Sequence, residues 1–236
     1  MSHAGFGTML SEGRSRSVFF GEIRGQRDHM ASAFGWLLGD APVFSFGPPV
    51  TVNDFKAFAV KCWFMALMRI VHYPEPVLLS VGKPVGDNEF GADLERTIAD
   101  MFETMHDAGG VGLAAPQVGL SQRLFVMDVA EEGQPNPLVF INPEIIRVEG
   151  EQVGDEGCLS FPGLYQSVKR DMRVIVRAQD VKGELVEHDL TDLAARCVLH
   201  ETDHCDGIVF LDRMTVLKRE LAKRKIKHLQ KTGKWE

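Results

Sequence analysis

Apolar residues in the second quarter of the chain recur at the spacing of one helix face. Leu94, Ile98, Met101 and Met105 fall three or four residues apart, which is the period of an amphipathic α-helix. Asp93 precedes the first of them as a candidate N-cap, and Gly109-Gly110 follows the last as a stop signal. The pattern therefore predicts a helix that packs one side against the core.

The next part of the chain contains short runs of β-branched and aromatic residues, which are typical of strands. Pro143 closes the second of these runs, and Asp180–Gly183 has the composition of a hairpin turn between the last two. The runs predict strands over residues 123–130, 138–142, 145–153, 173–179 and 184–189.

Two further helices are predicted near the C-terminus. The first begins at Thr191 or Asp192 as N-cap and ends at Asp206-Gly207. The second begins at about Thr215, and its apolar residues are candidates for contact with the body of the protein. These residues are Leu217, Leu221, Ile226 and Leu229.

Residues 1–64 lack sustained helical or strand periodicity, and Gly47-Pro48-Pro49 interrupts them. We therefore expect an N-terminal extension that is disordered or dispensable, followed by an organised region over residues 65–236. Met65 is the first residue of that region, so translation could start there. A helical appendage around Val52–Met68 is the alternative.

Composition restricts the setting more than the function. The net charge of −7 and a pI of about 5.6 give no overall attraction to DNA or RNA. No apolar stretch reaches the length of a membrane-spanning helix, and no secretory signal is recognisable. The four cysteines lack C-x-x-C spacing, which favours a reducing compartment. The cytoplasm is the expected location.

The segment His200-Glu201-Thr202-Asp203-His204 carries the clearest chemistry. Residues four apart on a helix share a face, so both imidazoles can reach one metal ion with Glu201 beside them. A chance pair of histidines on an amphipathic helix is the alternative, and a third ligand decides between the two. Cys158 is the candidate, because a thiolate and two imidazoles leave a fourth position open for water. A small buried apolar residue is the competing role for a free cysteine.

A glycine-containing loop, Gly110–Gln117, lies upstream of both segments. It lacks the Lys-Ser/Thr pair of a P-loop, so phosphate binding is not indicated. Its glycines instead permit unusual backbone angles or the close approach of another backbone.

These three segments, Gly110–Gln117, Glu156–Ser160 and His200–His204, occur in one order. In this combination the chain resembles the peptide deformylases of the bacterial type, from about Met68 to near Arg224. The resemblance implies an α+β fold, with antiparallel or mixed β-sheets around the central helix of the H-E-x-x-H motif and a C-terminal helix. It also implies that residues 65–236 form the catalytic domain.

The resemblance further implies a metal-dependent hydrolase that removes the formyl group from N-terminal formylmethionine of newly made polypeptides. Cys158, His200 and His204 would bind one divalent metal ion, Fe(II) first and Zn(II), Ni(II) or Co(II) as substitutes. Glu201 would transfer the proton, and the Gln117 side chain and the Leu159 backbone N–H would stabilise the oxyanion. The substrate would be bound by Gly110, Val111, Gly112 and Cys197.

Two other functions stay open from the residues alone. A zincin-like metalloprotease would take its third ligand downstream, where Glu220 is available. A metal-stabilised module that binds the ribosome or RNA would use the Lys- and Arg-rich end of the chain. In a deformylase the same basic helix could dock the enzyme at the ribosome. We expect a monomer without DNA or membrane partners.

Overall fold

The computed structural model describes residues 66–131 and 133–235. The predicted extension over residues 1–64 lies outside the described residues, as does most of the alternative helix around Val52–Met68. Residues 66–68 are described and are not helical. In the described part of the chain, no helix is long and apolar enough to cross a membrane.

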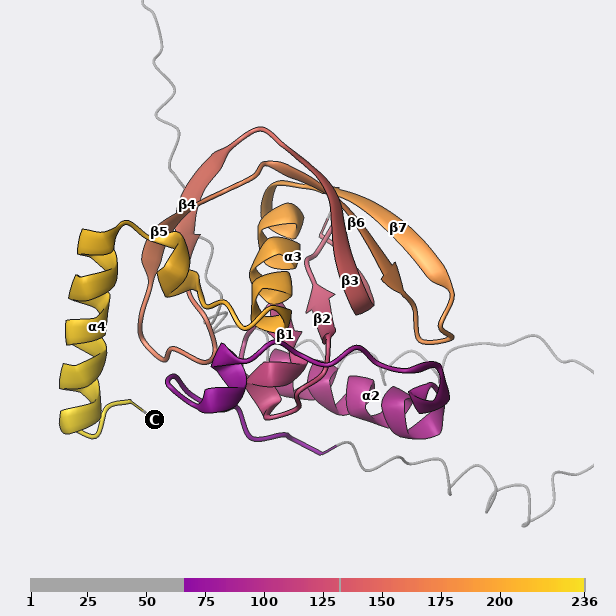
Figure 1. Ribbon diagram of the computed structural model, residues 1–236, viewed down its shortest axis with the longest axis horizontal. Helices are drawn as coiled ribbons and strands as arrows, with labels where there is room; N and C mark the ends of the chain where they lie inside the picture. The colour runs from indigo at the N-terminus through magenta and orange to yellow at the C-terminus, as the bar shows by residue number, and fades with distance from the viewer. Residues whose placement is uncertain (1–65, 132, 236) are drawn as a thin grey trace, which may run out of the picture.

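Two antiparallel sheets form the framework (Figure 1). The larger has the strand order β1-β2-β3-β6-β7, and the smaller pairs β4 with β5. The strands are β1 (Gly112–Ala114), β2 (Leu124–Asp128), β3 (Pro137–Glu149), β4 (Gln152–Glu156), β5 (Gln166–Arg170), β6 (Arg173–Gln179) and β7 (Leu185–Thr191).

Helix α3 (Asp192–Cys205) lies at the centre, with β3, β6 and β7 on one side and β4 and β5 on the other (Figure 1). It is buried on nearly every side from Ala195 onward, because sheet residues such as Val174 and Val176 pack against it. Thr191 is its N-cap and Asp206 its C-cap, as predicted. The α+β fold around a central helix is confirmed.

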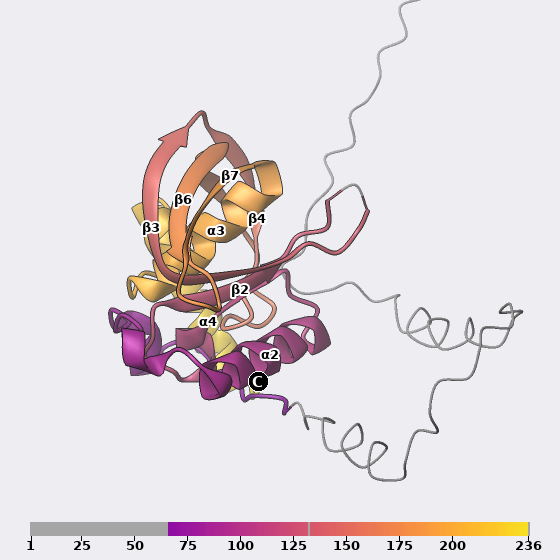
Figure 2. The same ribbon diagram turned by 90° about the vertical axis from the view of Figure 1, so that its right-hand side faces the viewer.

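Helix α2 (Ala92–Asp107) covers the opposite face of β1 and β2 (Figure 2). Its predicted apolar face is buried at Leu94, Ile98, Met101 and Met105. The predicted N-cap is wrong, because Gly91 holds that position and Asp93 lies in the first turn. Gly91 has φ 146°, a backbone angle that favours glycine, so the chain turns before Asp93.

Strand β3 differs most from the sequence-based expectation. Two strands were predicted on either side of Pro143, yet one strand runs through it and ends at Glu149. A bulge at this point shifts the register against β6. Asn142 enters the left-handed region there with φ 53°, and its side chain bonds both backbone groups of Val85 (2.8 and 2.9 Å). This bulge explains how a proline is tolerated within the strand.

Helix α4 (Val216–Lys231) forms the C-terminal element and begins at about Thr215 as predicted, with Thr215 as its N-cap. Its contact face contains Ala222 and Ile226, which are buried. Leu217 and Leu221 were predicted to make this contact, but they are 71% and 55% exposed, so that expectation is wrong. Leu221 lies one residue before Ala222, and one residue corresponds to a rotation of about 100° around the helix axis. Its side chain therefore points away from the contact face.

Four short 3₁₀ helices connect these elements in the described part of the chain. These helices are η1 (Pro76–Leu79), η2 (Asp87–Glu89), η3 (Ala115–Val118) and η4 (Phe210–Arg213).

Candidate metal centre

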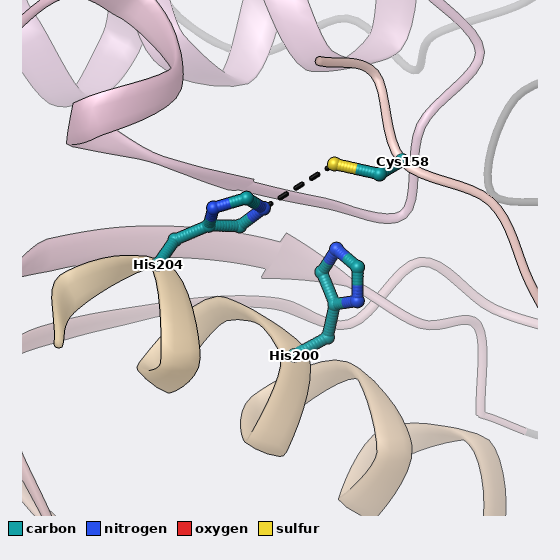
Figure 3. A group of neighbouring side chains, drawn as sticks. All are labelled: Cys158, His200 and His204. Carbon is teal, nitrogen blue, oxygen red and sulfur yellow. Dashed lines mark hydrogen bonds between the residues drawn. The ribbon is translucent and has the colours of Figure 1, made fainter. Parts of the chain in front are cut away.

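Cys158, His200 and His204 converge in the interior (Figure 3). One ligand atom from each lies within 4.8 Å of the other two, and Cys158 Sγ is 3.3 Å from His204 Nε2. All three side chains are buried. Among the described residues, no other group of three His, Cys, Asp or Glu side chains is close enough together to hold a metal ion. The structure thus brings the three predicted ligands together.

Different elements supply the three side chains. His200 and His204 lie one turn apart on α3, and Cys158 follows β4. Residues Cys158–Phe161 form a tight turn, here named the ligand turn, in which the Phe161 N–H donates to the Cys158 carbonyl (2.8 Å). A second bond, from the Tyr73 N–H to the Ser160 carbonyl (3.0 Å), ties this turn to the chain before η1. Cys158 is therefore fixed through its own backbone.

The Gln117 side chain reaches the same place from η3. Its Oε1 accepts from the Ala114 N–H (2.7 Å), so the amide is held in one orientation. Its Nε2 then points to Cys158 Sγ at 3.4 Å. Gln117 is 1% exposed. A fixed N–H donor consequently faces the centre, as the resemblance implied.

Glu201 lies beside the histidines and is 1% exposed. Its Oε2 has no hydrogen-bond partner among the described residues. Burial raises the pKa of Glu201 to about 7, and the negative charge of Glu156 acts in the same direction. A carboxyl group with such a pKa can both accept and release a proton near neutral pH.

Gly112 lies directly against this carboxylate. A Cβ at Gly112 would lie 2.6 Å from both Glu201 Oε1 and Cys197 Sγ, so only glycine fits. A Cβ at Gly110 would lie 2.9 Å from Leu159 Cδ1. Neither glycine has a positive φ. Their absence of a side chain therefore allows the loop to pack against α3 and the ligand turn.

Val111 and Cys197 are also adjacent in the structure. Cys197 is fully buried, and its Sγ lies 3.5 Å from the Val111 carbonyl oxygen. Val111 is partly exposed. Contact of either residue with a substrate stays a prediction.

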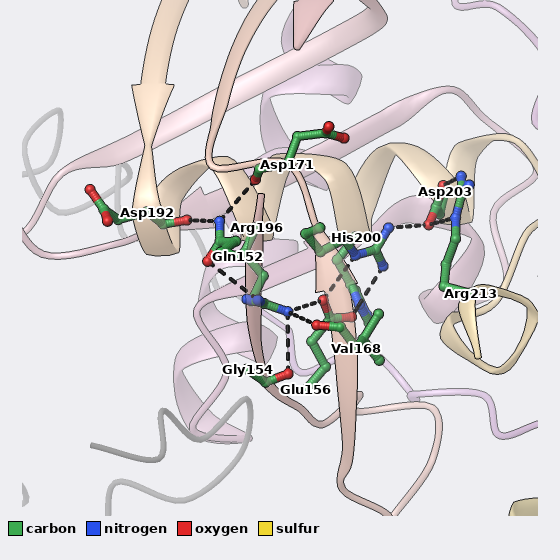
Figure 4. Close-up of polar contacts among 11 residues, drawn as sticks. Gln152, Gly154, Glu156, Val168, Asp171, Asp192, Arg196, His200, Asp203 and Arg213 are labelled. Carbon is green, nitrogen blue, oxygen red and sulfur yellow. Dashed lines mark hydrogen bonds and ion pairs between the residues drawn. The ribbon is translucent and has the colours of Figure 1, made fainter. Parts of the chain in front are cut away.

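A buried charge cluster supports His200, and no role for this cluster was predicted from the sequence (Figure 4). Glu156 is fully buried and accepts from His200 Nδ1 at 3.0 Å. Arg170 binds the same carboxylate through two bonds of 2.9 and 3.1 Å, and Arg196 Nη1 adds one of 2.7 Å. Asp203 bonds Arg170 (2.6 Å) and Arg213 (2.9 Å) on the far side. These contacts fix the orientation of the His200 ring.

The sequence did contain a signal for this cluster. Arg196, His200 and Asp203 fall at positions i, i+4 and i+7 of one helix, and charged residues on the same face as a metal ligand indicate support for that ligand. Glu156 is part of the segment that contains Cys158. Arg170 had no local signal, because it lies in β5, a strand that was not predicted.

The charges around the three ligands suit a divalent cation. Burial alone would raise the pKa of Glu156, but hydrogen bonds from His200 and Arg170 hold this pKa far below its usual range. Burial lowers the pKa of His204, which favours the neutral imidazole that a metal requires. Hydrogen bonds with Cys158 and Glu156 outweigh burial and raise the pKa of His200. A metal ion would thus have to displace a proton from His200, whereas His204 is already in the ligand form.

Comparison with known proteins adds the family. The family model for polypeptide deformylase matches residues 67–220. The chain belongs to the polypeptide deformylase family. The peptide deformylase of Acidobacterium capsulatum is 46% identical over 172 residues, which are 72% of this chain and 100% of that protein.

Solved deformylase structures share the fold as well. The crystal structure of a peptide deformylase from Legionella pneumophila matches with a TM-score of 0.66 and 41% identity, over 72% of this chain and 99% of that chain. The peptide deformylase of Ehrlichia chaffeensis in complex with actinonin matches with a TM-score of 0.65 and 36% identity, over 70% and 98%.

Membership in this family makes the chain a metal-dependent hydrolase that removes the N-formyl group from newly made polypeptides. The predicted resemblance is confirmed. The comparisons support neither a metalloprotease nor an RNA-binding module. A zincin would need Glu220 as its third ligand. The Glu220 side chain on α4 is 56% exposed, and its Oε1 lies 3.6 Å from Lys223 Nζ.

Proposed function

We propose that Cys158, His200 and His204 bind one divalent metal ion, with Fe(II) as the native metal and Zn(II), Ni(II) or Co(II) as substitutes. The convergence of one thiol and two imidazoles carries the proposal, since this set is typical of catalytic sites with an open position. Such an ion lowers the pKa of water toward about 7 and so supplies a nucleophile at neutral pH.

Glu201 is the proton-transfer residue in this proposal. Its Oε2 is buried without a partner in the described part of the chain, so it is free to accept a proton from the attacking water. Its raised pKa then allows the carboxyl group to pass that proton to the departing amine of methionine. Gly112 is required beside it, because a larger residue would displace the carboxylate.

Two N–H groups stabilise the negative charge that develops on the formyl oxygen. Gln117 Nε2 is the first, because Ala114 holds its amide in the required orientation. The Leu159 N–H is the second. The Leu159 N–H and the Cys158 carbonyl belong to one planar peptide unit and point in opposite directions. Because the Phe161 N–H donates to that carbonyl, the Leu159 N–H points away from Phe161 N. The hydrogen bonds of Gln117 and of the ligand turn support this role for both donors.

The substrate binds as an extended strand in this account. β1 is an edge strand, paired with β2 on one side. Within Gly110–Gly112, the Val111 carbonyl accepts from the Asp128 N–H and the Gly110 N–H donates to the Met105 carbonyl. The other backbone groups of this segment would bond the peptide, and main-chain bonding accepts many different sequences. Val111 and Cys197 are our candidates for contact with the methionine side chain.

The roles of Glu201 and Gln117 are tested with formyl-Met tripeptides and the metal-loaded protein. Glu201→Gln should keep the metal and lose about 10²–10⁴-fold in kcat, the usual range for a general base. Gln117→Leu should lose about 10²–10³-fold. Glu220→Gln is the matched control and should retain full formate release. An active Glu201→Gln enzyme would remove the proposed base.

The domain limits and the location belong to this proposal too. Residues 65–236 form the catalytic domain, supported by the family match over residues 67–220, and residues 1–64 are a dispensable extension. We place the enzyme in the cytoplasm as a monomer, where nascent formylated chains appear.

Docking at the ribosome through α4 is a further part of the proposal. The helix has seven Lys and Arg residues and one Glu, and Arg224, Lys227 and Lys231 are exposed. Such clusters bind phosphate backbones with release of counterions. Replacing these three residues with Glu should abolish co-sedimentation with ribosomes at low salt, while Lys182→Glu on the β6–β7 hairpin should not. Unchanged sedimentation of the triple variant would contradict docking.

A further inference from the structure

Trp235, near the end of the chain, lies buried beside the ligand turn. It is only 8% exposed although it follows the last helix. Its Nε1–H donates to the Tyr73 carbonyl (2.8 Å), and its ring meets Phe161 edge-on with 6.1 Å between ring centroids. The C-terminus is thereby joined to the two segments that hold Cys158 in position.

Phe161 is the centre of this contact. Its ring is fully buried, stacks on Tyr73 (5.0 Å between centroids) and meets Phe210 at a near right angle (5.0 Å). Its backbone N–H is the donor that fixes the Cys158 carbonyl. Movement of the Phe161 ring would therefore move the ligand turn.

Trp235 covers one side of this aromatic cluster. Cys158, Phe161 and Trp235 belong to one core cluster, together with Ala222 and Ile226 of α4. Aromatic pairs of this kind contribute about 0.5–1.5 kcal/mol beyond their buried area. Removing the indole would leave a cavity against Phe161, and the walls of such cavities move in part to fill them.

Two lysines of α4 hold the chain after the ligand turn more weakly. Lys225 Nζ donates to the Gly163 carbonyl (3.2 Å) and Lys218 Nζ to the Ser167 carbonyl (3.5 Å). Both lysines are exposed, so each bond contributes little. Trp235 is the buried contact after the end of α4, and it adds to those of Ala222 and Ile226 within the helix.

We propose that Trp235 is a positioning residue, which holds the ligand turn through Phe161 and Tyr73 and so fixes both the Cys158 thiolate and the Leu159 N–H. The inference rests on the proposed metal site. Loss of the indole should loosen the turn without opening the sheet, because β6 and β7 make no part of this cluster. Metal retention and donor placement should then weaken together.

The test compares Trp235→Ala, Trp235→Phe and Leu221→Ala in the full chain loaded with Co²⁺. Leu221→Ala is the matched control, because this residue lies on the adjoining helix α4 but is 55% exposed. Three quantities are measured: the rate of Co²⁺ release to a chelator, the exchange rate of the Phe161 amide hydrogen in the metal-free chain, and kcat and KM separately.

We expect Trp235→Ala to release Co²⁺ about tenfold faster, at the lower end of the losses known for residues that orient metal ligands. The Phe161 amide should exchange faster while β6 amides stay protected, and kcat should fall more than KM rises. Trp235→Phe should lie between this variant and wild type, since it keeps the ring edge and loses the N–H. Leu221→Ala should match wild type.

Wild-type release and exchange rates in Trp235→Ala would overturn the role of Trp235, as would faster exchange spread equally over β6. Where Trp235→Ala does not fold, Trp235→Phe decides: faster release supports the role, and wild-type release overturns it. A wild-type chain that binds no Co²⁺ would overturn the metal site itself, and the role of Trp235 with it.

Discussion

Replacing Glu156 with Gln tests how much the buried charge cluster contributes to stability and to metal binding. The Glu156 carboxylate is fully buried and accepts from Arg170, Arg196 and His200. The Glu156→Gln substitution would remove one negative charge between two guanidinium groups and place an N–H₂ group among donors. Breaking a buried ion pair costs about 3–5 kcal/mol. Because Gln keeps one acceptor oxygen, we expect the lower end of that range.

Metal affinity should fall in the same variant. His200 Nδ1 loses the acceptor that fixes its ring, and losses of this kind weaken metal binding about 10–100-fold. The assays are urea unfolding of the metal-free protein and titration with metal against a competing chelator. Glu149→Gln is the matched control. Its side chain is 37% exposed and pairs with Arg147 and Arg173, so we expect a loss below about 1 kcal/mol.

One result would refute this reasoning. Glu156→Gln with a free energy of unfolding within about 1 kcal/mol of wild type, together with unchanged metal affinity, would show that the cluster neither stabilises the core nor orients His200.

Three further predictions concern other parts of the chain. Gly112→Ala should lower formate release at least about tenfold and the free energy of unfolding by about 1–3 kcal/mol. The reason is that the new Cβ would lie 2.6 Å from Glu201 Oε1 and Cys197 Sγ. Normal activity of this variant would contradict the close packing. Burial lowers the pKa of His188 below 6.5, so its neutral form adds stability above pH 6.5 that is lost as the pH falls through the lowered value. His188→Gln should therefore lose less stability than wild type in urea unfolding between pH 7.5 and 5, and equal losses would argue against this. A chain that begins at Met65 should fold and release formate like the full chain, and an inactive or unfolded product would show that residues 1–64 are needed.

The parts of the site that depend on local spacing could be predicted from the sequence. His200 and His204 share a helix face whatever surrounds them, so four-residue spacing was sufficient. Cys158 required only that its segment fold back onto that helix. Arg170 could not be found in this way, because its role depends on β5 and on burial between Glu156 and Asp203, which no local pattern records.

The fold shows the same division. Long periodic helices such as α2 and α3 were predicted. Strand β1, of three residues, is too short for a periodic signal, and β5 has one apolar residue, Val168, among four polar ones. Pro143 suggested a strand end because the sequence does not reveal the bulge around it. On α4 the predicted contacts of Ile226 and Leu229 are confirmed, whereas Leu217 and Leu221 are exposed and Ala222 takes part instead, since the contact face is determined by the partner surface.

The metal content of Cys158→Ala tests the central claim most directly. Wild type and Cys205→Ala, both purified without oxygen and loaded with Fe(II) or Ni(II), should each hold one metal ion per chain. Cys205 is a suitable control because it is buried beside a ligand, and its Sγ contacts the Leu124 carbonyl at 3.8 Å. Cys158→Ala should hold none and release no formate. A Cys158→Ala chain that keeps its metal would contradict the Cys-His-His site.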